Sequence, residues 1–414
     1  MEKSHKLILL LISIVFITSC KNRLEVVETG SLTPMPEQWI DKDTHHKVIR
    51  LTDPGLNSRS FYFHNDPFLK LDKSNHDYMV YYGNVPQNTD DKDFTPRNGR
   101  QIYLMDLKTR ESVQITDHPG FLSGEIVGKK GKRVYYQVMD SVFSTHLETR
   151  ETELVFVFPE NLRGSITTLN ADETLLGGVY SDVEKQNILA QFPRKGDFFE
   201  RIYNAKIRHT LITVNIEDGT MTEIFSDTAW INHVQFSPAD PEQLMFCHEG
   251  PWHKVDRIWT INIEEKKPML MHRRTMNREI AGHEFFSVDG KTIWFDLQMP
   301  RGETFFLAGV DIETGEEIRY AMKRDEWSIH FNISPDQKTF AGDGGDEGQV
   351  AKAKDGMWLY HFFPEGDNLR SEKLVNMKHH DYDLEPNVHF SPDGKWIIFR
   401  ANFEGSSQVY AVEI

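Results

Sequence analysis

A short phrase of sequence returns along this chain and constrains its fold more than any other feature. Its clearest copy, Phe390–Phe399, reads FSPDGKWIIF: an apolar run, a Ser-Pro-Asp-Gly turn signal and a second apolar run. These turn residues favour a tight reversal, so each copy predicts two antiparallel strands, A and B. Weaker copies recur at spacings of roughly 40 to 70 residues, within the period range of repeat architectures. They begin at Leu69, Val127, Leu169, Phe236, Phe286 and Ile333.

A second phrase follows most copies and completes each repeat. In Leu307–Gly315 it alternates apolar and polar residues and then enters a polar turn, after which another short strand begins. Each repeat therefore predicts four antiparallel strands, A to D. One such sheet cannot bury both of its faces alone, whereas several sheets packed radially can. The sequence predicts an all-β chain folded as a seven-bladed β-propeller of four-stranded antiparallel blades.

The two ends of the propeller sequence predict how the ring closes. Gln408–Ile414 has the pattern of a third strand in the last repeat, and no fourth strand follows it. We expect the N-terminal segment Lys47–Thr52 to supply that strand and close the ring. The propeller is predicted to occupy residues 37–414 as a single domain.

The first residues resemble a bacterial export signal. Two lysines precede an apolar run, Leu7–Phe16, and the segment ends in Ile-Thr-Ser-Cys20. A small residue followed by cysteine resembles a lipobox, so residues 1–20 are predicted to be a lipoprotein signal peptide with lipidation at Cys20. A flexible tether is predicted over 21–36, and the bacterial cell envelope, at the periplasm or outer membrane, as the location. The alternative is a simple signal peptide with an incidental cysteine.

Charge and cysteine content narrow the classes of partner. The formal net charge of −16 argues against binding nucleic acid or an anionic membrane surface, so the lipid anchor is the one expected membrane contact. An anionic ligand would need a locally basic pocket. With Cys20 lipidated, Cys247 is the other of two cysteines, and no disulfide is expected in the mature chain. Cys247 lies in an apolar run and is predicted to be buried.

Polar residues are predicted to gather at one end of the ring. In an antiparallel blade the A–B turn lies on one face, and the B–C and D–A connections lie on the other. Counting back from the turn aspartates reaches the same level of successive A strands. That level holds Asp66, His233, His283, His330 and Asn387. Polar side chains could simply line a water-filled channel, but several histidines at one level favour a metal site or a proton-transfer site.

Further candidate residues fall at the same end. A long connection, Ser181–His209, is expected to form a wall over the site. Histidine, glutamate and asparagine together suit Mn²⁺, and arginines favour a carboxylate-bearing ligand. The additional residues are Arg59, His64, Arg208, His248, Glu249, Arg257, Glu385 and His389.

This combination of residues suits β-elimination of a uronate. A cation on the sugar carboxylate acidifies the C5 proton, a base removes that proton, and the C4 oxygen leaves. The sequence has no Gly-x-Ser-x-Gly motif, which argues against a serine peptidase with a propeller.

At these residues the chain resembles the oligogalacturonate lyases, seven-bladed propellers that cleave short pectic uronides with Mn²⁺. The resemblance covers nearly the whole mature chain. Its most specific pieces are Cys247–Pro251, Val255–Trp259, His283–Phe285 and His330 ahead of Gly342–Gly344. The resemblance implies that Arg257 and His283 are the catalytic pair.

The metal-ligand motif of the family is altered here. The resemblance implies a metal ligand at His330, together with a glutamine and a His-x-His pair in the last blade. In this chain Tyr382 stands at the glutamine, and Glu385-Pro-Asn387 replaces His-x-His. Oxygen ligands suit Mn²⁺ or Ca²⁺, so a divalent metal is still predicted, with His330, Glu385 and Asn387 as ligands and His389 in reserve.

The sequence therefore predicts a carbon–oxygen lyase that acts on uronate-containing oligosaccharides, with oligogalacturonate as the default substrate. The alternatives are a non-catalytic propeller that binds a glycan or a protein, and a hydrolase with paired carboxylates such as Glu249, Glu284 and Glu385. We expect alanine at Arg257 to abolish turnover without unfolding the chain. Substrate-binding roles are predicted for Arg59, His64, Arg208, His233, His248 and Glu249.

Overall fold

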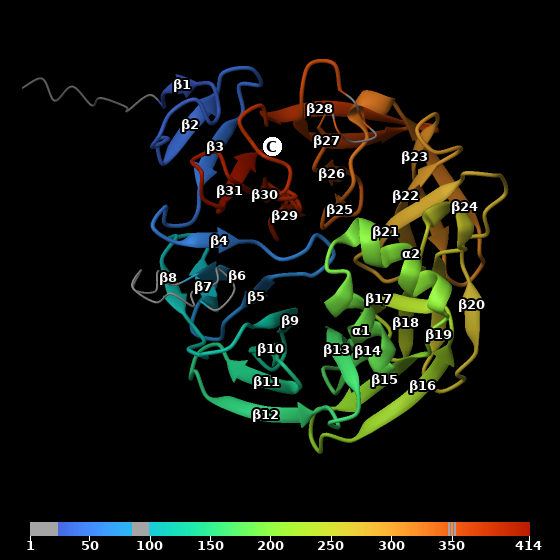
Figure 1. Ribbon diagram of the computed structural model, residues 1–414. Coiled ribbons are helices and arrows are strands. Elements are labelled where there is room, and N and C mark those ends of the chain that lie inside the picture. The colour runs from blue at the N-terminus through green and yellow to red at the C-terminus, as the bar shows by residue number, and fades with distance from the viewer. Residues whose placement is uncertain (1–23, 85–98, 347, 349–350, 352) are drawn as a thin grey trace, which may run out of the picture.

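Antiparallel sheets arranged around a common centre make up the protein (Figure 1). The computed structural model describes residues 24–84, 99–346, 348, 351 and 353–414. The strands of these residues form six sheets. The architecture is all-β and propeller-like, as predicted. The predicted signal peptide, with Cys20, lies outside the described residues.

Three sheets have four strands each and follow the chain in order. The first contains β9 (Ser123–Gly128), β10 (Arg133–Val138), β11 (Ser141–His146) and β12 (Thr152–Val157). The second contains β13 (Arg163–Leu169), β14 (Leu175–Ser181), β15 (His209–Asn215) and β16 (Met221–Asp227). The third contains β17 (Trp230–Phe236), β18 (Gln243–Glu249), β19 (Ile258–Asn262) and β20 (Pro268–Leu270).

An eight-stranded sheet joins two sets of four strands through one parallel pair, Ala321 opposite Asn368. The first set is β21 (Ile280–Phe286), β22 (Thr292–Gln298), β23 (Phe305–Asp311) and β24 (Glu317–Met322). The second set is β25 (Phe331–Ile333), β26 (Phe340–Gly342), β27 (Trp358–Glu365) and β28 (Asn368–Asn376).

In a five-stranded sheet, two short strands, β4 and β5, both pair with β6. The residues between β4 and β5 therefore run free of the ladder. The strands are β4 (Asn57–Arg59), β5 (Phe68–Lys70), β6 (Asp77–Asn84), β7 (Arg100–Asp106) and β8 (Ser112–Gln114).

The sixth sheet brings the two ends of the chain together. β3 pairs antiparallel with β31, with Val48 opposite Val412. This sheet contains β1 (Val26–Val27), β2 (Gln38–Asp41), β3 (Lys47–Arg50), β29 (His389–Phe390), β30 (Trp396–Ala401) and β31 (Gln408–Glu413).

The described part of the predicted tether is packed against the sixth sheet. β1 pairs with β2, and the buried Thr29 hydroxyl donates to Asp41 at 2.6 Å. Met35 is buried in the same hydrophobic cluster as Trp39. From residue 24 onward the segment is therefore not a free linker, because its polar and apolar groups find partners on the sheet.

The repeated Ser-Pro-Asp-Gly phrase forms the predicted A–B turn. Ser391 Oγ donates to Asp393 at 2.7 Å and accepts the backbone N–H of Trp396 at 3.1 Å. Gly394 has φ +68°, a conformation that glycine adopts without strain. The copies that begin at Phe286 and Ile333 make the same serine contacts. The hydrophobic core lies between neighbouring sheets, as where Tyr81 packs against Ile398 and Val409.

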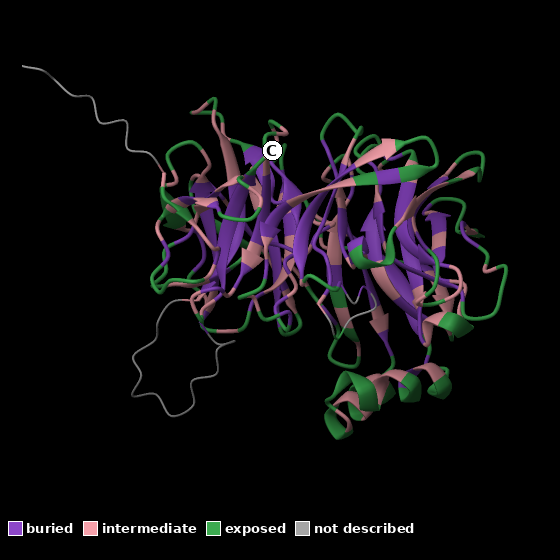
Figure 2. Ribbon diagram, turned by 90° about the horizontal axis from the view of Figure 1, so that it is seen from above, coloured by how far each residue is buried: buried purple, intermediate pink, exposed green. Residues whose placement is uncertain are grey.

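The long connection between β14 and β15 forms two helices, not the loop that the sequence suggested. They are α1 (Val183–Gln191) and α2 (Lys195–Ala205). Phe199 and Ile202 of α2 pack on Trp230, which fixes the helical pair to the start of β17. The pair projects from one face of the ring (Figure 2). It forms the expected wall on the face of the B–C connections.

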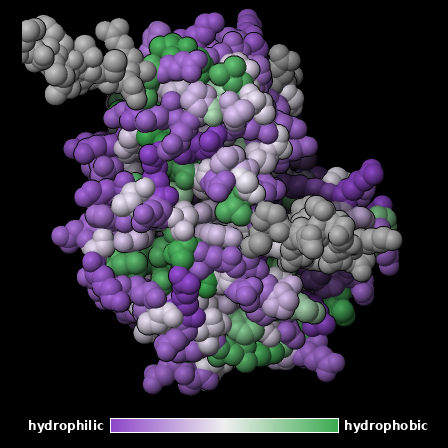
Figure 3. Space-filling model, turned by 90° about the vertical axis from the view of Figure 1, so that its left-hand side faces the viewer, coloured by the Kyte–Doolittle hydropathy of each residue, from purple (hydrophilic) through white to green (hydrophobic). Residues whose placement is uncertain are grey.

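The side of the molecule that carries β1 to β3 and β8 is largely hydrophilic, with small separate hydrophobic patches (Figure 3). Within the described residues, no helix has the length and apolar character needed to cross a membrane.

A buried ion pair links β3 to the connection before β31. Arg50 Nη1 lies 2.9 Å from Glu404 Oε2, and the two side chains are 11% and 5% exposed. Arg50→Ala leaves this carboxylate without a cation, so we expect the free energy of unfolding to fall by about 3–5 kcal/mol in urea denaturation. Arg370→Ala, at an exposed pair with Glu365, is the control and should change it by about 1 kcal/mol or less. An equal loss of unfolding free energy in the two variants would contradict a stabilising role of the buried pair.

Candidate active site

The level of polar residues predicted from the sequence lies where A strands leave regular geometry. His233 in β17 and His283 in β21 have φ +47° and +51°, and the ladder register shifts around both residues. Asn387, just before β29, has φ +50°. A bulge re-aims a side chain, and the left-handed conformation costs a non-glycine residue roughly 1–3 kcal/mol. Strain at three equivalent positions is a reason to treat this level as a candidate functional site.

His283 is oriented by a buried carboxylate on the neighbouring strand. Its Nδ1 lies 2.7 Å from Oδ1 of Asp296 in β22, and its side chain is 24% exposed. Burial by itself lowers the pKa of His283, but the Asp296 carboxylate outweighs burial and raises it above the ordinary value. Because Nδ1 donates to Asp296, Nε2 is the atom left to exchange a proton with a substrate.

His330 has the same arrangement, deeper in the structure. Its Nδ1 lies 2.6 Å from Asp343 Oδ2, and both side chains are fully buried. Nε2 lies 3.2 Å from the Tyr62 hydroxyl and 3.9 Å from Glu385 Oε2. The His283 and His330 rings meet edge to face, with centroids 5.1 Å apart. The structure thus brings together two carboxylate-backed imidazoles.

The two other predicted metal ligands have different surroundings. Asn387 Oδ1 accepts the backbone N–H of Phe63 at 2.9 Å, so its oxygen holds the segment between β4 and β5. His389 Nε2 contacts the carbonyl of Asn65 at 3.1 Å, and burial lowers the pKa of His389 to about 4. His389 lines a cleft of about 480 Å³ on the side of the A–B turns. Neither side chain contacts His330 in this arrangement.

Arg257 lies between two buried carboxylates. Its Nε donates to Glu284 Oε2 at 3.0 Å and its Nη1 to Glu249 Oε1 at 2.7 Å, with 4% of the side chain exposed. Burial opposes the charge of Arg257, but the two carboxylates raise its pKa well above the ordinary value. Arg257 therefore stays a guanidinium and is poorly suited to act as a base.

The same contacts argue against the hydrolase alternative for Glu249 and Glu284. Burial alone would raise the pKa of each, but Arg257 holds both below the ordinary value. A glycosidase acid must keep its proton near neutral pH, and these two carboxylates lose theirs.

His233, Cys247 and Glu249 place three potential metal-ligand atoms within 4.8 Å of one another. Glu249 is already neutralised by Arg257, and its second oxygen lies 3.5 Å from His233 Nε2. Burial raises the pKa of the Cys247 thiol well above its usual value, so the sulfur stays protonated. The guanidinium of Arg257 beside these three residues disfavours a metal ion there. We therefore interpret His233, Cys247 and Glu249 as a structural cluster.

The sequence-predicted substrate-binding residues do not all converge. His64 lies at the centre, with its ring 6.4 Å from that of His233, and burial lowers the pKa of His64 to about 3. His248 is largely buried, with its ring 4.8 Å from that of Trp259 and its Nε2 3.7 Å from Asp227 Oδ2. Arg208 donates to Ser226 on β16 and is exposed, and Arg59 is exposed on β4. Their binding roles stay predictions.

Sequence reasoning missed four residues that shape the centre: Tyr62, Asp296, Asp343 and Arg400. Arg400 donates to the backbone carbonyls of Glu385 at 2.7 Å and Ser60 at 2.9 Å. It thereby fixes the main chain that carries Glu385. A signal was present for Asp296 and Arg400, since each is a charged residue inside an otherwise apolar strand.

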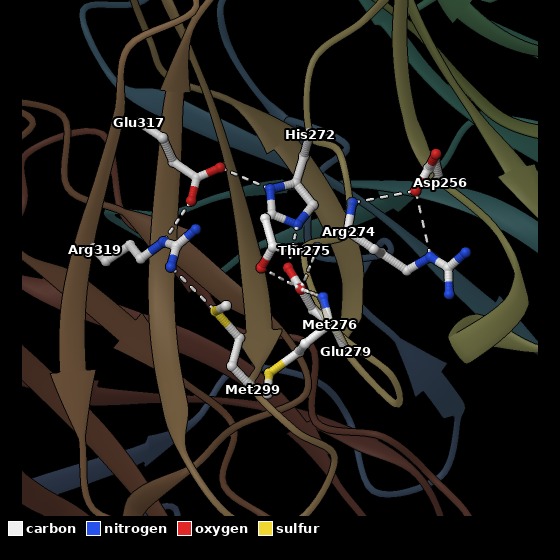
Figure 4. Close-up of polar contacts among 9 residues, drawn as sticks. All are labelled: Asp256, His272, Arg274, Thr275, Met276, Glu279, Met299, Glu317 and Arg319. Atoms are coloured by element: carbon white, nitrogen blue, oxygen red, sulfur yellow. Dashed lines mark hydrogen bonds and ion pairs between the residues drawn. The ribbon is translucent and has the colours of Figure 1, made fainter.

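Asp256 holds the connection between β18 and β19, which also carries Arg257, to Arg274 of the segment after β20 (Figure 4). Arg274 Nε lies 3.3 Å from Oδ1 of Asp256, the residue before Arg257. His272 is held between Glu317 at 2.6 Å and Glu279 at 3.0 Å. These contacts fix the segment after β20, so the position of Arg257 depends on residues of two neighbouring sheets.

The fold and the central cluster define a propeller enzyme with paired imidazole–carboxylate groups. A family model described as oligogalacturonate lyase matches residues 32–414, and the chain belongs to that family. The family predicted from the sequence is confirmed, and with it the assignment to the lyases.

Similar proteins agree with this family. An oligogalacturonate lyase of Dickeya dadantii (strain 3937) is 25% identical over 395 residues, which cover 90% of this chain and 95% of that protein. An oligogalacturonide lyase of Pectobacterium atrosepticum is 24% identical over 394 residues, with the same coverage. A solved oligogalacturonate lyase in complex with manganese superposes with a TM-score of 0.76 at 24% identity, over 91% of this chain and 95% of that one. The oligogalacturonate lyase of Vibrio parahaemolyticus has the same score and identity, over 91% and 96%.

The burial of Arg257 changes the expectation drawn from the sequence. Arg257→Ala leaves two buried carboxylates unpaired, so we expect the free energy of unfolding to fall by about 3–5 kcal/mol or more, along with loss of turnover. Arg257→Lys keeps the charge but not the fork that reaches both partners, so it should lose less stability. Chemical denaturation of both variants measures this difference. Wild-type stability in the alanine variant would contradict the pairing.

Proposed function

We propose that the protein cleaves oligogalacturonate by β-elimination at the centre of the ring. One observation carries the proposal: the rings of His283 and His330 meet 5.1 Å apart, and a buried carboxylate orients each. This arrangement fixes the tautomer of both imidazoles. It leaves Nε2 of His283 for proton transfer, whereas Nε2 of His330 lies beside the Tyr62 hydroxyl. Membership of the oligogalacturonate lyase family supports the same reaction and an acidic oligosaccharide as the partner.

In this proposal His283 is the base. Nε2 takes the C5 proton, the electrons of the C5–H bond form the C4–C5 double bond, and the C4–O bond breaks as the leaving oxygen takes up a proton from water. Asp296 stabilises the imidazolium that forms. The partial exposure of His283 allows substrate contact, whereas the fully buried His330 suits a supporting role.

His330 and Glu385 fit a divalent cation, Mn²⁺ or alternatively Ca²⁺. Their facing atoms are 3.9 Å apart, less than the sum of two metal–ligand bonds of about 2.1–2.3 Å, so one ion can reach both atoms. Asp343 supplies the carboxylate that commonly orients a metal-binding histidine. The cation would neutralise the uronate carboxylate and acidify the adjacent C5–H bond.

Two positions of the altered motif do not add ligands in this arrangement. Asn387 holds Phe63, and the Tyr382 hydroxyl donates to the carbonyl of Gly344 at 3.3 Å. We therefore propose a site with fewer protein ligands than the family motif implies. The remaining coordination positions would be open to water and to the substrate carboxylate.

We propose that these sheets form a propeller of seven blades. The eight-stranded sheet divides into two four-stranded blades because one residue pair joins β24 to β28. Pairing of β3 with β31 supports β3 as the strand that completes the last blade.

We also propose that the chain is lipid-anchored at Cys20 in the bacterial cell envelope. The apolar run ahead of Ile-Thr-Ser-Cys20 supports this location. Val26 already pairs with β2, so the anchored cysteine would stand only a few residues from the packed domain.

The direct test of the function is incubation of the protein with oligogalacturonides. We expect the ultraviolet absorbance of an unsaturated uronide product to rise, to be lost with EDTA and to return with Mn²⁺. Glu385→Ala should weaken Mn²⁺ binding, measured by calorimetry, by about tenfold or more, because one of the two proposed ligands is removed. No product from any uronide in a panel would overturn the proposal. EDTA-resistant turnover would overturn the metal assignment alone.

The activity should depend on pH through His283. A base works in its neutral form, so kcat/KM is low at acid pH and rises as the pH passes the pKa of His283. Asp296 raises that pKa, so Asp296→Asn should move the rising limb to lower pH while it lowers the maximal rate. Asp106→Asn, which alters a similar pair between Asp106 on β7 and His76, is the matched control and should leave the pH profile unchanged. An unmoved limb in Asp296→Asn would exclude His283 as the titrating base.

A further inference from the structure

A second cleft lies beside the central cluster, between the helical pair and the connection that carries Arg257. It has a volume of about 370 Å³. Its walls come from α2, from the 3-10 turn Trp252–Lys254 and from the first residue of β21. Its lining includes Lys195, Phe199, Trp252, Lys254, Ile280 and Arg301, together with Glu200, the partner of Lys254.

The lining of this cleft combines aromatic faces with positive charge. The Arg301 guanidinium lies 5.8 Å from the centroid of the Trp252 ring, and Lys195 Nζ lies 5.9 Å from that of Phe199. Lys254 is neutralised by Glu200 at 2.9 Å. Among the residues that the structure describes, no carboxylate lies within 4 Å of Arg301 or Lys195. Two exposed cations that line the same cleft without an anionic partner suit the binding of an anion.

The cleft lies close to His283, because a residue of its wall precedes the catalytic centre on the same strand. Ile280, in its wall, precedes His283 by three residues on β21, about 10 Å at the usual rise of about 3.3 Å per residue. Trp252 lies on the same connection as Arg257. A short chain of linked sugar rings with one end at His283 would span this distance.

We propose that the cleft is a distal subsite that binds one further uronate ring of the oligosaccharide. The inference rests on the proposed function and adds to it a specificity for longer, charged substrates. The Trp252 ring would pack on the C–H face of the sugar, and Arg301, assisted by Lys195, would bind its carboxylate. A neutral sugar would pack on the ring but would leave both cations without a partner. The subsite therefore selects uronates at a position away from the cleaved bond.

The test compares substrates of increasing length. Arg301→Gln and Trp252→Ala should each lower kcat/KM for tetragalacturonate by about tenfold, through KM with little change in kcat. The kcat/KM for digalacturonate should not change, because this substrate occupies only the positions on either side of the cleaved bond. Arg301→Lys should restore most of the loss, since it retains the positive charge. Equal losses on both substrates, or no loss on either, would overturn the subsite.

A matched control and a binding measurement separate this inference from the proposed function. Lys73→Gln removes an exposed cation in the turn between β5 and β6, on the opposite face, and should leave both substrates unaffected. Calorimetric titration with tetragalacturonate reports the subsite without turnover. If the wild-type protein turns over no uronide but binds tetragalacturonate more tightly than Arg301→Gln does, the function fails and the subsite stands. If turnover occurs and Arg301→Gln binds as tightly as the wild type, the subsite fails alone.

Discussion

Charge buried at the centre of the ring has to be compensated locally, and the rest of the site follows from this requirement. An ion taken out of water is costly unless a partner of opposite charge and good hydrogen-bond geometry accompanies it. Arg257 meets Glu249 and Glu284, and the two central histidines each meet an aspartate. Most of these partners come from a different strand of the ring. The positions of the reactive groups therefore depend on how strands and sheets sit against one another.

His283 and Arg257 have different surroundings, although the resemblance to the family implies that they form a catalytic pair. His283 keeps one nitrogen toward a partly open space, so it can gain and lose a proton during a reaction. Arg257 has its donors occupied and its charge fixed. We interpret Arg257 as the group that holds two carboxylates and the adjoining main chain in place.

The sequence predicted those parts of the structure that depend on local chemistry. The Ser-Pro-Asp-Gly phrase predicts its turn because the serine and aspartate side chains bond to the turn backbone itself. The common level of His233 and His283 follows from counting along strands. The carboxylates behind the histidines could not be predicted in the same way. Asp296 meets His283 only through the pairing of β21 with β22, and one sequence does not state which residues face each other across a bulge.

Two other differences between the sequence prediction and the structure have separate causes. The helices between β14 and β15 were missed because α1 buries no residue and so has no apolar periodicity. In α2 a signal was present, since Phe198, Phe199 and Ile202 share one face. The start of the packed chain was placed too late, because the groups that hold Thr29 and Met35 lie elsewhere in the sequence.

The pairing of β3 with β31 has a consequence for the order of events during synthesis. Val48 is synthesised long before Val412, so β3 has no partner until β31 has been made. A contact between such distant residues forms slowly and leaves an unpaired strand edge exposed in the meantime. Folding of the sixth sheet is therefore deferred until β31 has been synthesised.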